Sequence, residues 1–193
     1  MTTLNLAVSA STYIDYYHPT TNYESQSQIN ISGNNGAHLE KGLYVFNFST
    51  LPLNAIVITA NLMVYADPST AFTAQTLQAY RILTYISTWY ATWILASNGV
   101  NWTGAGCTGD GTDKAAAQLA EKELTSAGGG WLSVPLNIEE FALLRDSNKG
   151  ILLKLDDAET GQIAFSKGVN AAYIAVDYVI PGGATFLSDY GVL

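Results

Sequence analysis

The chain has 193 residues, enough for one large β-rich domain or at most two small ones. Charged residues make up only 12% of it, about half the usual share, and the formal net charge is −8 with eight Lys and Arg in all. This balance excludes a basic surface for nucleic acid, the single cysteine excludes an intrachain disulfide, and no apolar run approaches the roughly 20 residues that span a bilayer.

Short strands account for most of the pattern along the chain. Runs rich in Val, Ile, Tyr and Thr alternate between apolar and polar residues, most clearly over 62–67 and 174–179. The predicted strands lie near 4–9, 12–15, 27–32, 42–49, 56–66, 75–86, 130–136, 150–156, 162–166 and 172–180. Many short strands between Gly, Pro, Asn and Ser clusters are typical of an antiparallel β-sandwich or barrel.

A single short helix is predicted over 137–147. Asn137 is a suitable N-cap, and Glu140 follows three residues later, as in a capping box. Acidic residues in the first turn complement the positive end of the helix dipole, and Gly150 follows the last turn as a stop signal. We expect this helix to close one end of the β-rich domain.

The segment 97–130 has a different composition, because it carries many of the glycines. We interpret it as a long excursion from the sheet. The Ala-rich stretch 114–119 has a local preference for helix. We therefore expect a short helical turn near 112–117, followed by a strand near 119–126.

Asp110 and Asp113 frame a Gly-Thr dipeptide inside this segment. Carboxylates are ligands that Ca²⁺ takes, so a structural Ca²⁺ ion is one interpretation. The alternative is an ordinary turn in which Asp113 caps the Ala-rich stretch, since the spaced acidic positions of an EF-hand loop are missing. His18, His38 and Cys107 lie far apart in sequence and give no pattern for a zinc site.

The motifs do not favour an enzyme. The run 104–109 matches the glycine spacing of a dinucleotide fingerprint, but the required preceding strand and following helix are not predicted there. The chain also lacks the strained turn that presents a catalytic nucleophile. We therefore expect a protein without catalytic residues.

Aromatic residues are the candidates for ligand contact. Tyr16, Tyr17, Tyr23 and Trp102 fall in predicted loops and are expected to form an exposed surface that could stack on sugar rings. Trp131 opens an alternating strand, and we expect it to lie in the core instead.

Several stretches resemble a known family in their order along the chain. They are 12–15, 19–23, 42–48, 51–52, 58–65, 130–134 and 172–178. Together they resemble the DNRLRE-type domains, a β-sandwich group related to carbohydrate-binding modules. The resemblance implies an antiparallel jelly-roll-like β-sandwich with a binding or structural role. The chain departs from the family at Ser11, Lys41 and Asn47, where the family often has Asp, Arg and Asp.

Single-domain versions of this family resemble phage structural proteins. The first expectation is therefore a non-enzymatic virion surface protein, of the capsid-decoration or head-fibre kind, assembled in the host cytoplasm. Its partners would be capsid or other virion subunits or further copies of itself, with glycans as additional ligands. The alternative is a carbohydrate-binding module from a secreted, extracellular bacterial protein.

We expect one domain over 1–180 and a C-terminal tail over 181–193. The Pro-Gly-Gly run at 181–183 breaks the last strand. The tail carries five large apolar residues predicted to bind a partner, namely Phe186, Leu187, Tyr190, Val192 and Leu193. The alternative is that the tail folds back and covers an edge of its own sheet.

Overall fold

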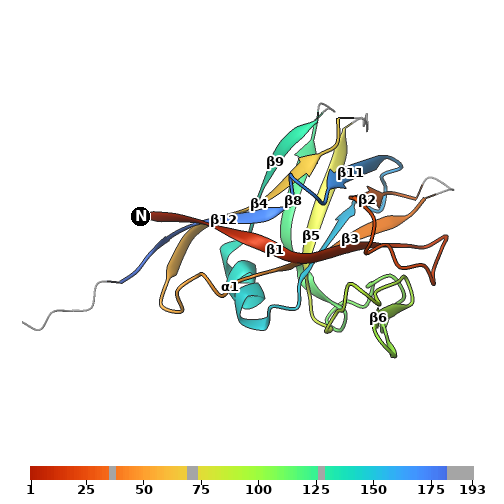
Figure 1. The fold of residues 1–193 in the computed structure, drawn as a ribbon, viewed down its shortest axis with the longest axis horizontal. Helices are drawn as coiled ribbons and strands as arrows, with labels where there is room; N and C mark the ends of the chain where they lie inside the picture. Colours follow the sequence, from red (N-terminus) through yellow and green to blue (C-terminus); the bar gives the residue numbers. More distant parts are fainter. Residues whose placement is uncertain (35–37, 69–73, 126–128, 182–193) are drawn as a thin grey trace, which may run out of the picture.

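The structure is a computed structural model that describes residues 1–34, 38–68, 74–125 and 129–181. Within these ranges the chain is all-β with one short helix and antiparallel pairing between its strands, which confirms the all-β, antiparallel part of the expected fold class (Figure 1). The elements are β1 (Thr2–Asp15), β2 (Gln28–Ser32), β3 (Glu40–Phe46), β4 (Ile56–Ala66), β5 (Gln75–Ile82), β6 (Leu95–Ser97), β7 (Val100–Asn101), β8 (Lys114–Leu124), β9 (Gly130–Pro135), α1 (Ile138–Ser147), β10 (Ile151–Leu155), β11 (Gln162–Ser166) and β12 (Tyr173–Val179).

Six strands form a closed ring in the order β1, β12, β4, β11, β2, β3 and back to β1. The long strand β1 pairs with two different strands: its first half pairs with β12 and its second half pairs with β3. Two junctions of the ring consist of one residue pair each. Ala66 of β4 pairs with Phe165 of β11, and Ser32 of β2 pairs with Glu40 of β3. The core is therefore a closed six-stranded barrel. Strands β10, β5 and β8 extend it beyond β3, and β9 pairs with β4.

The strand alternation predicted from sequence builds the barrel core. In β4 and β12 the residues Leu62, Val64, Ile174 and Val176 are fully buried, while their neighbours in sequence are partly exposed. This is the two-residue period of a strand with one face inward. Each such side chain contributes about 1.5–3 kcal/mol on burial, so the alternation determines which face turns inward.

The helix forms where the sequence predicts it. The Asn137 side chain accepts a hydrogen bond from the backbone N–H of Glu140 at 3.0 Å, which caps the first turn. The C-cap is Asn148, in the left-handed conformation at φ 42°, so the helix ends before Gly150. Phe141 and Leu144 pack into the barrel core.

The expected helical turn near 112–117 is wrong. Lys114–Leu124 is strand β8, which pairs with β5 over its whole length. The helix preference of the Ala-rich stretch amounts to a few tenths of a kcal/mol per residue. Backbone pairing with β5 and the burial of Leu119 and Leu124 outweigh it. The strand that we expected near 119–126 within the excursion 97–130 is present, but it begins earlier, at Lys114.

The remaining loop, residues 83–113, lies against the sheet and is called the cover segment below. Its apolar residues meet the outer side chains of β1, β3, β5 and β10 in a second buried cluster. The members of that cluster are Ile86, Ala91, Trp93, Ala96, Trp102 and Cys107 from the cover segment and Ile14, Leu43, Tyr80, Ile82 and Leu152 from the strands. These strands are consequently buried on both faces.

Candidate functional site

The predicted aromatic surface is only partly present. Tyr16 and Tyr17 are exposed and meet edge to face, with ring centres 5.1 Å apart. Tyr23 is half-buried and stacks on Tyr13 at 4.2 Å. Trp102 does not belong to this surface, because it is buried in the second cluster and its indole N–H donates to a backbone carbonyl of the cover segment. Sequence placed Trp102 in an exposed loop, but the loop packs on the sheet.

Asp110 and Asp113 have different surroundings in the structure. Asp113 is fully buried, and its two oxygens accept backbone N–H groups of Thr103, Gly104 and Gly109 at 2.7–3.1 Å. Asp110 forms an ion pair with Lys114 instead. Across the described ranges no group of three or more His, Cys, Asp or Glu side chains is arranged to hold a metal ion. The arrangement fits a carboxylate that braces a turn.

The five tail residues predicted to bind a partner lie outside the described residues. They are Phe186, Leu187, Tyr190, Val192 and Leu193.

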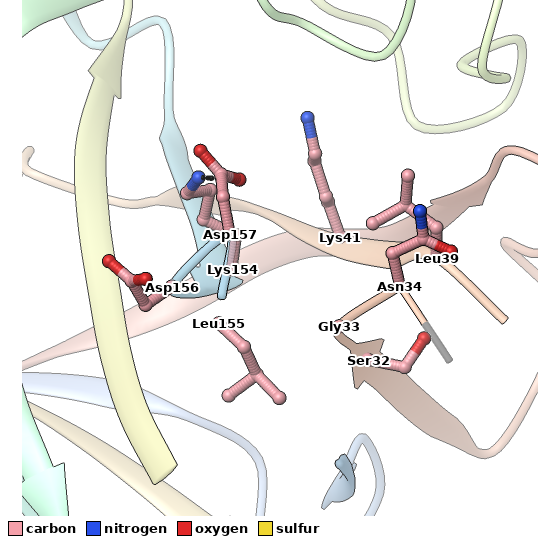
Figure 2. A pocket seen from close by; sticks show the side chains of 9 residues that line it. All are labelled: Ser32, Gly33, Asn34, Leu39, Lys41, Lys154, Leu155, Asp156 and Asp157. Carbon is pink, nitrogen blue, oxygen red and sulfur yellow. Dashed lines mark hydrogen bonds and ion pairs between the residues drawn. The ribbon is translucent and has the colours of Figure 1, made fainter. Parts of the chain in front are cut away.

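A cleft of about 180 Å³ opens where β2 ends, β3 begins and β10 ends (Figure 2). It lies beside the cover segment, at the margin of the second buried cluster. Its lining residues are Ser32, Gly33, Asn34, Leu39, Lys41, Lys154, Leu155, Asp156 and Asp157.

Lys41 is the most unusual residue of this cleft, because its ammonium group is almost entirely buried. The Nζ atom donates to the carbonyl of Gly106 at 2.9 Å and lies 4.9 Å from the ring centre of Trp93. Burial, followed by repulsion from Lys154, lowers the pKa of Lys41 to about 8. Below that pH the side chain carries a buried positive charge, which the carbonyl dipole and the indole face stabilise.

The other charges of the cleft are matched. Lys154 pairs with Asp157 at 2.5 Å, and this hydrogen bond lowers the pKa of Asp157 (Figure 2). Asp156 accepts the side-chain amide of Gln78 at 2.8 Å. The cleft therefore offers positively and negatively charged groups that can form hydrogen bonds. The sequence signal for it is Lys154, a charged residue inside the otherwise apolar strand β10, together with Lys41, which follows Glu40 at the start of β3.

Trp131 is not in the core, so our expectation for it is wrong. It is 43% exposed on the outer face of β9, with Tyr65 and Tyr173 beside it at 5.4 and 5.1 Å between ring centres. The residues of β9 that face inward are Leu132 and Val134. The strand alternates as predicted, but Trp131 occupies the outward position.

A second surface lies where β1 begins, β4 begins and β12 ends. These strand ends project from the barrel at the left of Figure 1, away from the cover segment around β6. Large apolar side chains are exposed here, and together they are called the apolar tip. Its members are Met1, Leu53, Ile56, Ile58 and Ile180.

Comparison with known proteins gives no family assignment. No protein-family model matches the chain, and no curated protein matches its sequence. Among the described residues no helix has the length and apolar character needed to cross a membrane.

Proposed function

We propose that this chain is a non-enzymatic structural protein of a virion surface, of the capsid-decoration or head-fibre kind, assembled in the host cytoplasm. The proposal includes the DNRLRE-type parent fold, a jelly-roll-like sandwich related to carbohydrate-binding modules. Two features support that parent fold: β1 is shared between β12 and β3, and two junctions of the ring consist of one residue pair each. A sandwich whose two sheets touch at their margins has these features.

The apolar tip is the observation that carries the proposal. Single exposed apolar residues are normal, whereas several on adjoining strand ends, as at the ends of β1, β12 and β4, favour a contact surface. Ile56 pairs with Val179 on the neighbouring strand, so the start of β4 and the end of β12 form one edge of this surface. Burying each large side chain on a partner would contribute about 1.5–3 kcal/mol. A capsid subunit or a second copy of the chain is the partner that this surface fits.

The position of the tip agrees with the expected role of the tail. The last strand ends at Val179, and Ile180 is already part of the tip. The chain continues from there into the tail with its five apolar residues. We propose that tip and tail bind the same neighbouring subunit.

The test is the double variant Ile56→Ser/Ile58→Ser, with Val169→Ser as the control because Val169 is fully exposed elsewhere. Sedimentation velocity over a concentration series should show association in the wild type and the control, and weaker association in the double variant. Electron microscopy of particles from the source material should show the chain in repeated copies on their surface. A chain that is monomeric at all concentrations and absent from particles would contradict the proposal.

The second candidate is a carbohydrate-binding module of a secreted bacterial protein. The exterior aromatic group around Trp131 favours it, since flat apolar rings with polar edges suit sugar rings. Recovery of the chain from culture medium bound to a polysaccharide, with no particle association, would decide for this candidate.

A further inference from the structure

Two buried lysines lie side by side in the cleft between β2, β3 and β10. Lys41 and Lys154 are only 6% and 8% exposed, and both line the cleft. The ladder between β3 and β10 pairs Gly42 with Leu153, so its next step places Lys41 opposite Lys154. Opposite residues of a ladder point to the same face of the sheet, and Figure 2 shows both ammonium groups on the same side of their strands. Two positive charges are therefore neighbours in a buried place.

Negative charge does not balance this pair inside the protein. Like charges directly opposite each other in a ladder are destabilising. Over the described part of the chain Lys41 forms no ion pair, and its ammonium group contacts only a carbonyl and an indole ring. Lys154 pairs with Asp157, but the Asp157 side chain is 89% exposed. Positive charge is thus concentrated in the buried part of the cleft, and negative charge lies at its rim.

The remaining lining limits the size of a ligand. A volume of about 180 Å³ equals that of about six water molecules at roughly 30 Å³ each. This is smaller than the roughly 300–1,000 Å³ of sites for drug-sized molecules. Ser32 and Asn34 are uncharged polar residues of the lining, and the half-buried Leu39 is an apolar one. The cleft therefore has room for a small molecule with one polar end and a short apolar body.

We infer that this cleft binds a short-chain carboxylate, with Lys41 and Lys154 each donating to one of its two oxygens. Hydrogen bonds between two charged groups are about twice as strong as those between neutral groups, and the anion would offset the repulsion between the two lysines. Asp156 and Asp157 at the rim repel a second negative charge. A monoanion is therefore favoured over phosphate or a dicarboxylate, while the lysine pair repels metal cations.

The test is a nuclear magnetic resonance titration of the isotope-labelled chain with acetate, propionate and butyrate at pH 7. Sodium chloride keeps the ionic strength constant, and inorganic phosphate and succinate are the comparisons of higher charge. We expect at least one monocarboxylate to bind more tightly than phosphate and succinate. Lys41→Met should weaken this binding at least tenfold. Lys154→Gln should weaken it at least threefold, because Lys154 already shares its charge with Asp157.

Binding should also depend on pH. The pKa of Lys41 is about 8, so its ammonium group is charged at pH 7 and neutral at pH 10. The other charged or titratable groups that act on it are Lys154, Cys107, Asp157 and Lys114. The Cys107 thiol stays protonated over this range, because burial raises its pKa to about 12. The affinity at pH 10 should therefore be at least tenfold weaker. This comparison needs no variant, so it carries the test if Lys41→Met does not fold.

Lys149→Met is the matched control, since Lys149 is exposed, donates to the carbonyl of Leu83 and lies outside the lining of the cleft. Its affinity should equal that of the wild type. Each of five results overturns the inference: no binding of any monocarboxylate, tighter binding of phosphate or succinate, undiminished affinity in either cleft variant, undiminished affinity at pH 10, or equal loss in the control. The apolar-tip variants should bind the carboxylate normally, which separates this cleft from the assembly surface.

Discussion

At the residue scale, the buried ammonium group of Lys41 lowers the free energy of unfolding by an amount that depends on pH. Its pKa in the folded protein is about 8, below the ordinary value of 10.5. A depressed lysine pKa means that the unfolded chain binds the proton more tightly. With respect to this group, the free energy of unfolding is therefore highest above about pH 10.5, where Lys41 is neutral in both states. It decreases as the pH falls through 8, where the buried ammonium group becomes charged.

We predict that Lys41→Met raises the free energy of unfolding at pH 7 by about 1–3 kcal/mol, since each pKa unit corresponds to about 1.4 kcal/mol and the lost contacts with Gly106 and Trp93 offset part of the gain. Denaturant titrations at pH 7 and pH 10 measure the effect, which should shrink at the higher pH. Lys149→Met, at an exposed lysine, is the control. A variant less stable than the wild type at both pH values would show that the ammonium contacts dominate.

A second buried charge predicts the opposite trend with pH. Glu40 lies opposite Asp15 in the β1–β3 ladder, and burial raises the pKa of its carboxyl group. A raised carboxyl pKa stabilises the fold below the ordinary value of 4.5, and that contribution is lost as the pH rises through the folded pKa. Glu40→Gln should therefore be more stable than the wild type at pH 7, with the difference disappearing near pH 3. Thermal unfolding across this range tests it, and Glu139→Gln on the exposed helix surface should show no such trend.

At the scale of elements, the cover segment depends on one carboxylate. Replacing Asp113 by Ala leaves three partly buried backbone N–H groups without their acceptor, at about 1 kcal/mol each or more. We predict that Asp113→Ala lowers the free energy of unfolding by about 3 kcal/mol or more. Asp110→Ala, at the exposed neighbouring acid, should stay within about 0.5 kcal/mol of the wild type. Hydrogen exchange should locate the effect of Asp113→Ala at the amides of Thr103 and Gly104; equal losses in both variants would contradict this role.

The outer strand β9 allows a comparison between two aromatic residues. Trp131 is exposed and gains mainly from its two tyrosine contacts, worth about 0.5–1.5 kcal/mol each. Phe141 of α1 is buried in the core, where truncation to Ala costs about 3–5 kcal/mol. We predict a loss of about 1–2 kcal/mol for Trp131→Ala and a clearly larger loss for Phe141→Ala, measured as shifts in denaturant midpoint. If the order is reversed, Trp131 contributes to folding more than its exposure indicates.

At the scale of the whole molecule, the barrel is complete without the tail. The ring closes with β12, which ends at Val179. We predict that deletion of residues 184–193 leaves the melting temperature of the monomer unchanged and weakens its association. Differential scanning calorimetry and sedimentation velocity measure the two quantities separately. A destabilised monomer that associates normally would show that the tail covers its own sheet.

The sequence by itself determined the class of the fold, because local chemistry governs its elements. The alternation at 174–179 predicted a strand with one buried face. Asn137 and Glu140 predicted the start of the one helix, since a capping bond joins residues only three apart. Both signals depend only on residues a few positions apart in the chain. Tertiary packing is compatible with them, so these elements form where the sequence predicts them.

The tertiary structure alone decided where the functional surfaces lie. Whether Trp102 or Trp131 is exposed depends on which distant segment packs against each, and their local patterns gave the opposite answer. The stretch 114–119 became a strand because β5 supplied a partner, a long-range contact stronger than helix propensity. Lys41 acquired its buried charge only when residues from the cover segment closed over β3. The exposure of a side chain, the pairing of a strand and the pKa of a group all depend on neighbours in space. They are therefore determined only in the assembled fold.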